Sequence, residues 1–225
     1  MRLTKALISK VYRDMDDPGP VPDVAHMDDE DYARTVAFLA RQHLTNEPLR
    51  VFAYGSLMWD PEYEVVDHEI GTAYGWHRAF AMRMERYRGT IDRPGLMMGL
   101  ERGGCCRGQV HTVAPGDFFG SLNALVRREL ITKPCTYSAR WLTVRTSRGD
   151  VQAISFVLDP HGHFYEGQLC PNTTARRIAH ATGHIGTNAE YLMNTVAHLE
   201  WMGIPDRNLE HLDHLVAQEI QQSYD

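Results

Sequence analysis

The feature that most constrains this chain is a short apolar run that ends abruptly in two small residues. The run from Val51 to Tyr54 is followed by Gly55 and Ser56 before bulky residues return at Leu57. Short apolar runs bounded by turn residues are typical of buried strands. Glycine tolerates positive φ and lets a ligand approach the backbone, while neighbouring N–H groups can point into one concavity. We therefore expect a core strand that delivers a loop for an anion or a developing oxyanion, although an ordinary turn has the same spacing.

Length and composition favour a compact protein without a nucleic-acid or membrane surface. The chain has 225 residues, is 43% hydrophobic and carries a formal net charge of −6 at pH 7, which suits one α+β domain or two small ones. A nucleic-acid surface needs concentrated positive charge, and the sequence contains no Lys/Arg-rich cluster. It also lacks an apolar stretch of about 20 residues and the apolar core of a signal peptide. We therefore expect a cytoplasmic protein with no nucleic-acid or membrane partner.

The cysteines and histidines do not form a recognisable metal motif. The four cysteines show no C-x-x-C spacing, so we expect reduced thiols. His180 and His184 lie four residues apart without the glutamate of an H-E-x-x-H motif, and His211 and His214 likewise match no metal-binding motif with a third ligand. We therefore expect neither a metal nor a cofactor.

The N-terminal segment differs in composition from the rest of the chain. Residues 17–23 read Asp-Pro-Gly-Pro-Val-Pro-Asp, a composition that blocks regular structure. We expect residues 1–28 to form a surface arm or linker and residues 29–225 to form a single domain. An apolar stripe behind an acidic first turn predicts a helix from Asp29 to about Leu44.

The middle of the chain predicts a curved, mostly antiparallel sheet with short connections. The stretch from Val65 to Met84 reads as two strands broken near Gly75, and a further pair flanks the turn at Gly103-Gly104. Further strands are expected over 137–146 and 151–158. Helices that pack on the core are expected over 172–183, 187–203 and 206–222.

One helix in this region carries an acidic residue on its apolar face. Asp117 is a typical N-cap residue, and Phe118, Leu122, Leu125 and Val126 form one stripe. Three residues beyond Val126 the same face reaches Glu129, which has no obvious ion partner at helical spacing. Burial of an unpaired carboxylate raises its pKa toward the range that is useful for proton transfer. If the helix ends early, Glu129 would instead lie in solvent.

Five segments in this order resemble the ChaC family. They begin at Val51 (VFAYGSLMW), Gly75 (GWHRAF), Arg88 (RGT, with RPG from Arg93), Arg128 (RELIT) and Gly186 (GTNAEYL). The resemblance implies a γ-glutamylcyclotransferase fold, a small mixed, mostly antiparallel β-barrel or sheet with flanking helices. It also implies cleavage of glutathione, a small-molecule partner, to 5-oxoproline and cysteinylglycine.

The resemblance also assigns site residues. Glu129 is implied to be the general acid/base, and the loop from Tyr54 to Leu57 to hold the γ-glutamyl group. The residues implied to bind substrate are Val51, Phe52, Ala53, Tyr54, Gly55, Ser56, Leu57, Arg78, Tyr137 and Tyr165. The segment Lys133-Pro-Cys-Thr-Tyr137 departs from the Gly-x-Tyr that family members commonly carry, which puts substrate preference in doubt.

Three functions stay open at this point. The first is cleavage of glutathione, the second is the same chemistry on other γ-glutamyl amines or dipeptides, and the third is a non-catalytic γ-glutamyl-binding or regulatory protein. Only the enzymes need a carboxylate that transfers protons, so Glu129 separates them from the binding protein. The sequence leaves the oligomeric state and the role of Cys105 and Cys106 open.

Overall fold

The structure is a computed structural model that describes residues 1–43 and 47–224. Its contacts divide the chain into two compact units. The first consists of Met1–Val24, Phe80–Met98 and Glu166–Asp225, and the second of Ala25–Ala79 and Gly99–Tyr165. The prediction that residues 29–225 form a single domain stays a prediction.

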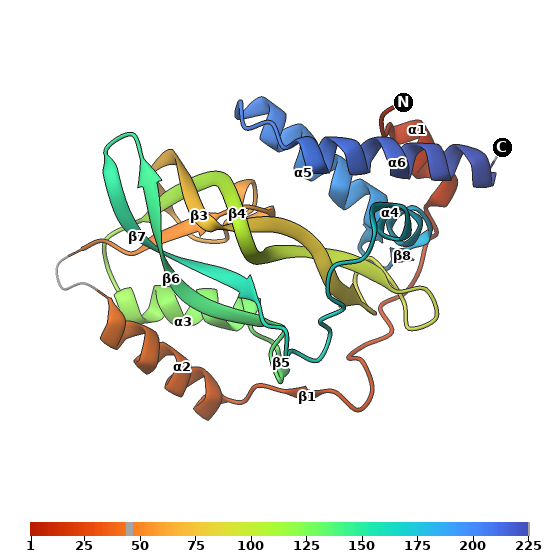
Figure 1. Ribbon diagram of the computed structural model, residues 1–225. Coiled ribbons are helices and arrows are strands. Elements are labelled where there is room, and N and C mark those ends of the chain that lie inside the picture. Colours follow the sequence, from red (N-terminus) through yellow and green to blue (C-terminus); the bar gives the residue numbers. More distant parts are fainter. Residues whose placement is uncertain (44–46, 225) are drawn as a thin grey trace. The chain divides into compact units, whose positions relative to one another are not determined.

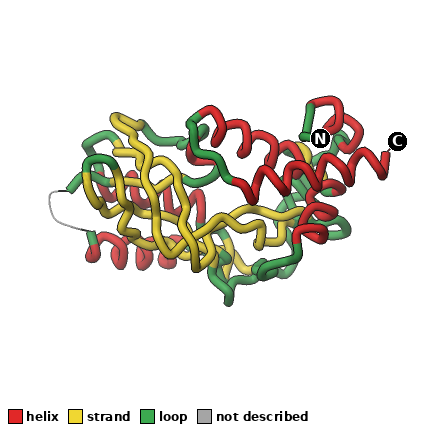
Figure 2. Tube along the Cα trace, turned by 45° about the horizontal axis from the view of Figure 1, so that its top comes forward, coloured by secondary structure: helices red, strands yellow, loops and turns green. Residues whose placement is uncertain are grey.

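Five of the strands form a closed β-barrel (Figure 1). Its strands follow the order β2-β4-β3-β6-β7, with additional pairing between β4 and β7. The β2–β4, β3–β6 and β6–β7 pairs are antiparallel, whereas β7 pairs with β2 and β4 in parallel. This confirms the predicted mixed, mostly antiparallel barrel, whose strands are yellow in Figure 2. The strand bounds are β2 Arg50–Ala53, β3 Val65–Met84, β4 Gly95–Val113, β6 Tyr137–Thr146 and β7 Gly149–Leu158.

Two strands are longer than the sequence predicted. β3 continues through Gly75, and β4 continues through Gly103 and Gly104, so the predicted breaks at these positions are wrong. Gly75 has a φ of 80°, and Gly103 and Gly104 have φ values of 109° and 65°. Glycine adopts these angles without strain, which lets a strand bend while its pairing continues.

Two helices cover one apolar face of the barrel within the second unit. α2 Asp29–Gln42 packs against α3 Phe118–Glu129, as their neighbouring positions in Figure 1 show. α2 begins with a capping box formed by Asp28 and Asp31, and it ends at Gln42; residue 44, to which the prediction extended, lies outside the described residues. The helices and barrel share one buried cluster, which includes Val36, Leu39, Val51, Ala53, Leu57, Leu122, Leu125, Val126, Ile154 and Phe156. Burial of this apolar surface is the main force that fixes α3 on the barrel.

Short elements complete the second unit around these helices. The 3₁₀-helix η1, Ser56–Met58, follows β2 directly. β1 Ala25–His26 pairs antiparallel with β5 Thr132–Lys133, which comes shortly after α3.

The first unit is mainly helical. α1 Lys5–Val11 and α5 Asn188–Trp201 both contact the long helix α6 Arg207–Tyr224, as does α4 Pro171–His180 (Figure 1). α4 begins one residue before the predicted Asn172, because Pro171 suits the first helical position. A small hairpin of β8 Thr182–Gly183 and β9 Gly186–Thr187 separates α4 from α5. None of the helices in the described residues is long and apolar enough to cross a membrane.

Part of the expected N-terminal arm is regular structure. Thr4 caps α1, and its Leu7, Ile8 and Val11 are buried, so the expectation of a surface segment without regular structure is wrong for these residues. Their spacing places all three side chains on one face of a short helix, where burial stabilises it.

Candidate active site

The loop after β2 presents a run of backbone N–H groups. Among the residues that the structure describes, the N–H groups of Gly55, Ser56 and Leu57 make no hydrogen bond, while those of Met58 and Trp59 close the turn of η1. Gly55 has a φ of −137°, so it does not use the positive φ that glycine tolerates. The loop nevertheless has the free donors that an anion or a developing oxyanion requires.

The start of the loop is anchored by buried polar contacts. Arg78, which is 8% exposed, donates from Nε to the carbonyl oxygen of Tyr54 at 2.8 Å and from Nη2 to that of Arg107 at 2.5 Å. The Tyr54 hydroxyl donates to the carbonyl oxygen of Phe156 at 2.7 Å. These contacts use Arg78 and Tyr54 to hold backbone in place, and the direct role in substrate binding predicted for them stays a prediction.

Glu129 is the last residue of α3, and its carboxyl group is largely buried. The helix does end here, as the alternative of an exposed Glu129 supposed, yet the side chain is only 19% exposed. Burial raises the pKa of Glu129 from 4.5 to about 7, the negative charge of Glu62 adds to the rise, and Arg128 opposes it. A carboxyl group with this pKa can both accept and return a proton near neutral pH.

Arg128 joins Glu129 to the segment that follows the loop. Its Nε lies 3.3 Å from Glu129 Oε1, its Nη1 lies 3.2 Å from Glu62 Oε1, and its Nη2 lies 3.8 Å from Asp60 Oδ2. The expectation of no ion partner at helical spacing left out the preceding residue, Arg128, which is the partner in the structure. A helical wheel describes the directions of Cβ atoms, whereas the long arginine side chain reaches sideways to its neighbour. Because Asp60 N–H also binds the Ser56 carbonyl oxygen, Arg128 ties Glu129 to the loop.

A second buried network lies beside this carboxyl group. The Tyr63 hydroxyl is 3.0 Å from His111 Nδ1, and His111 Nε2 is 3.0 Å from Gln109 Oε1. Burial, with a smaller contribution from His68, lowers the pKa of His111 from 6.5 to about 4, so its ring is neutral at pH 7. Nε2 then donates to Gln109, and Nδ1 accepts from Tyr63. Burial and the negative charge of Glu129 raise the pKa of Tyr63, which keeps its hydroxyl protonated.

Sequence reasoning missed four residues of this site. Tyr63 and Glu62 lie in an irregular segment, and Gln109 and His111 are polar residues within a strand that reads as apolar. His111 and Gln109 are 3% and 8% exposed. A histidine and a glutamine two residues apart on one strand face the same side, which was the one available signal.

Tyr137 and Tyr165, which are also predicted to bind substrate, line separate cavities of the second unit. Tyr137 lines a cavity of about 420 Å³ together with Leu130 and Cys135. Tyr165 lines one of about 280 Å³ that also contains Trp76. Its hydroxyl donates to Glu101 Oε1 at 2.6 Å, which raises the pKa of Tyr165 to about 12. Substrate binding by either tyrosine stays a prediction.

Comparison with known proteins adds the family. A family model described as ChaC-like protein matches residues 49–219. The chain belongs to the ChaC-like family. The predicted resemblance is thereby confirmed, and the matched range contains both the loop and Glu129.

Several named proteins are similar in sequence to this ChaC-like chain. The glutathione-specific γ-glutamylcyclotransferase of Escherichia coli is 37% identical over 166 residues, which are 73% of this chain and 71% of the relative. The mouse glutathione-specific γ-glutamylcyclotransferase 1 is 28% identical over 177 residues, 76% of this chain and 77% of the relative. A crystal structure of the yeast γ-glutamyl cyclotransferase specific to glutathione has a TM-score of 0.67 at 18% identity. It covers 79% of this ChaC-like chain and 97% of the yeast chain, and it supports the fold alone.

Proposed function

We propose that this ChaC-like protein cleaves glutathione to 5-oxoproline and cysteinylglycine, with Glu129 as the general acid/base. The relatives from bacteria and mouse are named for this activity. The observation that carries the proposal for this chain is the buried carboxyl group of Glu129, whose pKa of about 7 suits proton transfer, beside a loop with unpaired N–H groups.

The substrate supplies its own nucleophile in this reaction. The α-amine of the γ-glutamyl group attacks the γ-carbonyl carbon, a new C–N bond closes a five-membered ring, and the C–N bond to the cysteinyl amine breaks. Intramolecular attack is strongly favoured once the chain is held in a reactive conformation. The protein therefore has to fold the substrate and to move protons.

Glu129 can serve both proton transfers. The α-amine is mostly protonated near neutral pH, so ionised Glu129 first accepts a proton from it. The protonated carboxyl group then returns this proton to the departing cysteinyl nitrogen, which restores the ionised form. The second proton that the attacking nitrogen loses when the lactam forms passes in the same way to the released amine, which leaves as an ammonium group. A pKa near 7 keeps both forms accessible during one turnover.

The loop can stabilise the tetrahedral intermediate. Donors that point at a developing oxyanion act strongly where water is excluded, and removal of one typically costs about 3 kcal/mol. We assign this role to the N–H groups of Gly55, Ser56 and Leu57. Ser56 is then a binding residue, because no histidine or second base contacts it among the described residues.

The proposed function predicts a specific dependence on the free α-amine. The purified protein is expected to release 5-oxoproline from glutathione in the presence of a chelator, and to leave N-acetylglutathione intact because its acylated α-nitrogen cannot attack. Chromatography of 5-oxoproline and cysteinylglycine measures both reactions. If N-acetylglutathione is cleaved, the intramolecular mechanism is wrong; if neither glutathione nor other γ-glutamyl compounds react, the enzyme assignment is wrong.

A further inference from the structure

The beginning of α2 contacts the chain on both sides of Glu129. On the C-terminal side of Glu129, strand β5 pairs with β1. Lys133 lies opposite Ala25, and Thr132 lies opposite His26. The Met27 N–H adds a hydrogen bond of 2.9 Å to the Ile131 carbonyl oxygen. Residues 131–133, which follow shortly after Glu129, are thus bound to the segment that leads into α2.

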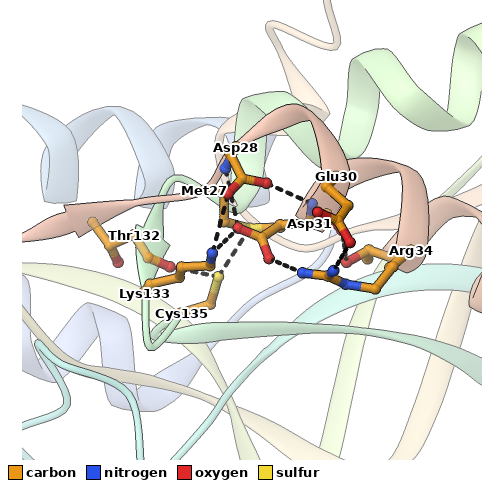
Figure 3. Close-up of polar contacts among 9 residues, drawn as sticks. Met27, Asp28, Glu30, Asp31, Arg34, Thr132, Lys133 and Cys135 are labelled. Atoms are coloured by element: carbon orange, nitrogen blue, oxygen red, sulfur yellow. Dashed lines mark hydrogen bonds and ion pairs between the residues drawn. The ribbon is translucent and has the colours of Figure 1, made fainter.

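Side chains strengthen this attachment (Figure 3). Lys133 Nζ forms an ion pair with the carboxylate of Asp31 and lies 3.5 Å from Asp28 Oδ2. Asp31 is 8% exposed, and the bond from Lys133 holds its pKa down at about 2, so it stays ionised over the working pH range. The same carboxylate accepts the Asp28 N–H at 3.1 Å as part of the capping box. The Asp31 carboxylate therefore contacts both the first turn of α2 and the segment after Glu129, and it holds the two together.

On the N-terminal side of Glu129, Arg127 contacts the same turn of α2. Arg127 Nη2 lies 2.6 Å from Asp29 Oδ1, and its guanidinium carbon lies 4.3 Å from the centre of the Tyr32 ring. Arg127 stands two residues before Glu129 and Lys133 four residues after it, so both flanks of the carboxylate contact one helical turn. Reactions that depend on alignment are sensitive to this support, since a displacement of about 1 Å can cost about 100-fold in rate.

We propose that the first turn of α2 is a positioning clamp for Glu129, in which the Asp31–Lys133 ion pair sets where the Glu129 carboxyl group lies. The clamp rests on the proposed function, because it serves a residue that transfers protons. Asp31 and Lys133 are positioning residues and act through the backbone of residues 130–132. The charged and titratable groups that act on Glu129 itself are Arg128 on its own helix and Glu62 and Tyr63 from the segment after η1.

Replacement of Lys133 by Met tests the clamp, since Met keeps much of the apolar stem and removes the charge. We expect kcat on glutathione to fall about tenfold with KM changed less than about twofold, because alignment is lost and binding is kept. We also expect the inflection of the pH–rate profile that reports Glu129 to move down by about one unit as water reaches the carboxyl group. Loss of a nearby positive charge alone would move it up, so the direction separates the two causes.

Four further variants sharpen the test. Lys133→Arg keeps the ion pair and should restore kcat. Asp31→Asn removes the ion pair with Lys133 and also the one with Arg34, so it should lower kcat at least as much as Lys133→Met. The double variant should lose little more than Asp31→Asn alone, because the Asp31–Lys133 pair is already broken. Arg145→Met removes the exposed Arg145–Asp150 pair elsewhere in the same unit and should leave kcat and the profile unchanged.

Measurements of folding and of the Glu129 pKa test the clamp independently of the proposed enzymatic activity. Circular dichroism and the Tm establish that each variant folds, and Asp31→Asn replaces Lys133→Met if the latter does not. A ¹³C NMR titration of the Glu129 carboxyl carbon, assigned with Glu129→Gln, measures its pKa without turnover. Folded Lys133→Met with wild-type kcat and an unchanged titration would overturn the clamp. An inactive wild type in which the titration still shifts down would overturn the proposed function and leave the clamp standing.

Discussion

Glu129→Gln is expected to lower the release of 5-oxoproline from glutathione by about 1,000-fold, within the range that positioned acid/base groups contribute. Gln matches Glu in shape and can still accept a hydrogen bond from Arg128, whose Nε lies 3.3 Å from the carboxylate. It cannot take a proton from the α-amine or give one to the leaving nitrogen. The expected loss is therefore in kcat, measured from initial rates at saturating glutathione, while KM changes little.

The control for this variant is the same replacement at an exposed glutamate. Glu200 lies on α5 in the first unit and pairs with Arg2 at the surface. Glu200→Gln should keep kcat within about twofold of the wild type. A folded Glu129→Gln protein with more than about one tenth of wild-type kcat would contradict the assignment of Glu129.

The same replacement is expected to change how stability depends on pH. The pKa of Glu129 is raised in the folded protein from 4.5 to about 7, so the folded state binds this proton more tightly than the unfolded state does. Wild-type stability therefore carries a penalty that is absent below pH 4.5, grows as the pH rises and is complete above pH 7. The shift corresponds to about 3 kcal/mol, so the free energy of unfolding of Glu129→Gln relative to wild type should rise by about this amount.

Urea unfolding of both proteins between pH 4.5 and 8 measures this difference. His111 also titrates in this window, since its pKa is lowered to about 4, but it does so in both proteins and cancels in the comparison. A difference that stays constant over the whole range would show that the Glu129 carboxyl group is not buried in its charged form.

Residues close together in the sequence allowed several features to be predicted. The run from Val51 to Leu57 predicted a buried strand and a loop, because apolar residues followed by Gly and Ser have few other uses in a core. The hairpin between β6 and β7 followed from turn residues between two β-rich segments. The stripe from Phe118 to Val126 placed Glu129 on the packed face of α3, since the periodicity of a helix is fixed by its geometry.

The rest depends on contacts between distant residues. Tyr63 and His111 are 48 residues apart, and neither has local neighbours that predict their hydrogen bond. Lys133 and Asp31 are likewise far apart in the sequence, and their ion pair depends on the packing of distant segments. The helical spacing of α3 likewise could not show that the guanidinium group of Arg128 reaches Glu129.

The pH dependence of kcat/KM on glutathione tests the central claim most directly, because the pKa of a buried Glu129 governs both proton transfers. The rate of 5-oxoproline release should rise between pH 5 and 8 with an inflection near 7, and the residual rate of Glu129→Gln should lack this inflection. An inflection near 4.5 in the wild type, or the same inflection near 7 in Glu129→Gln, would contradict the assignment of a buried Glu129 as the general acid/base.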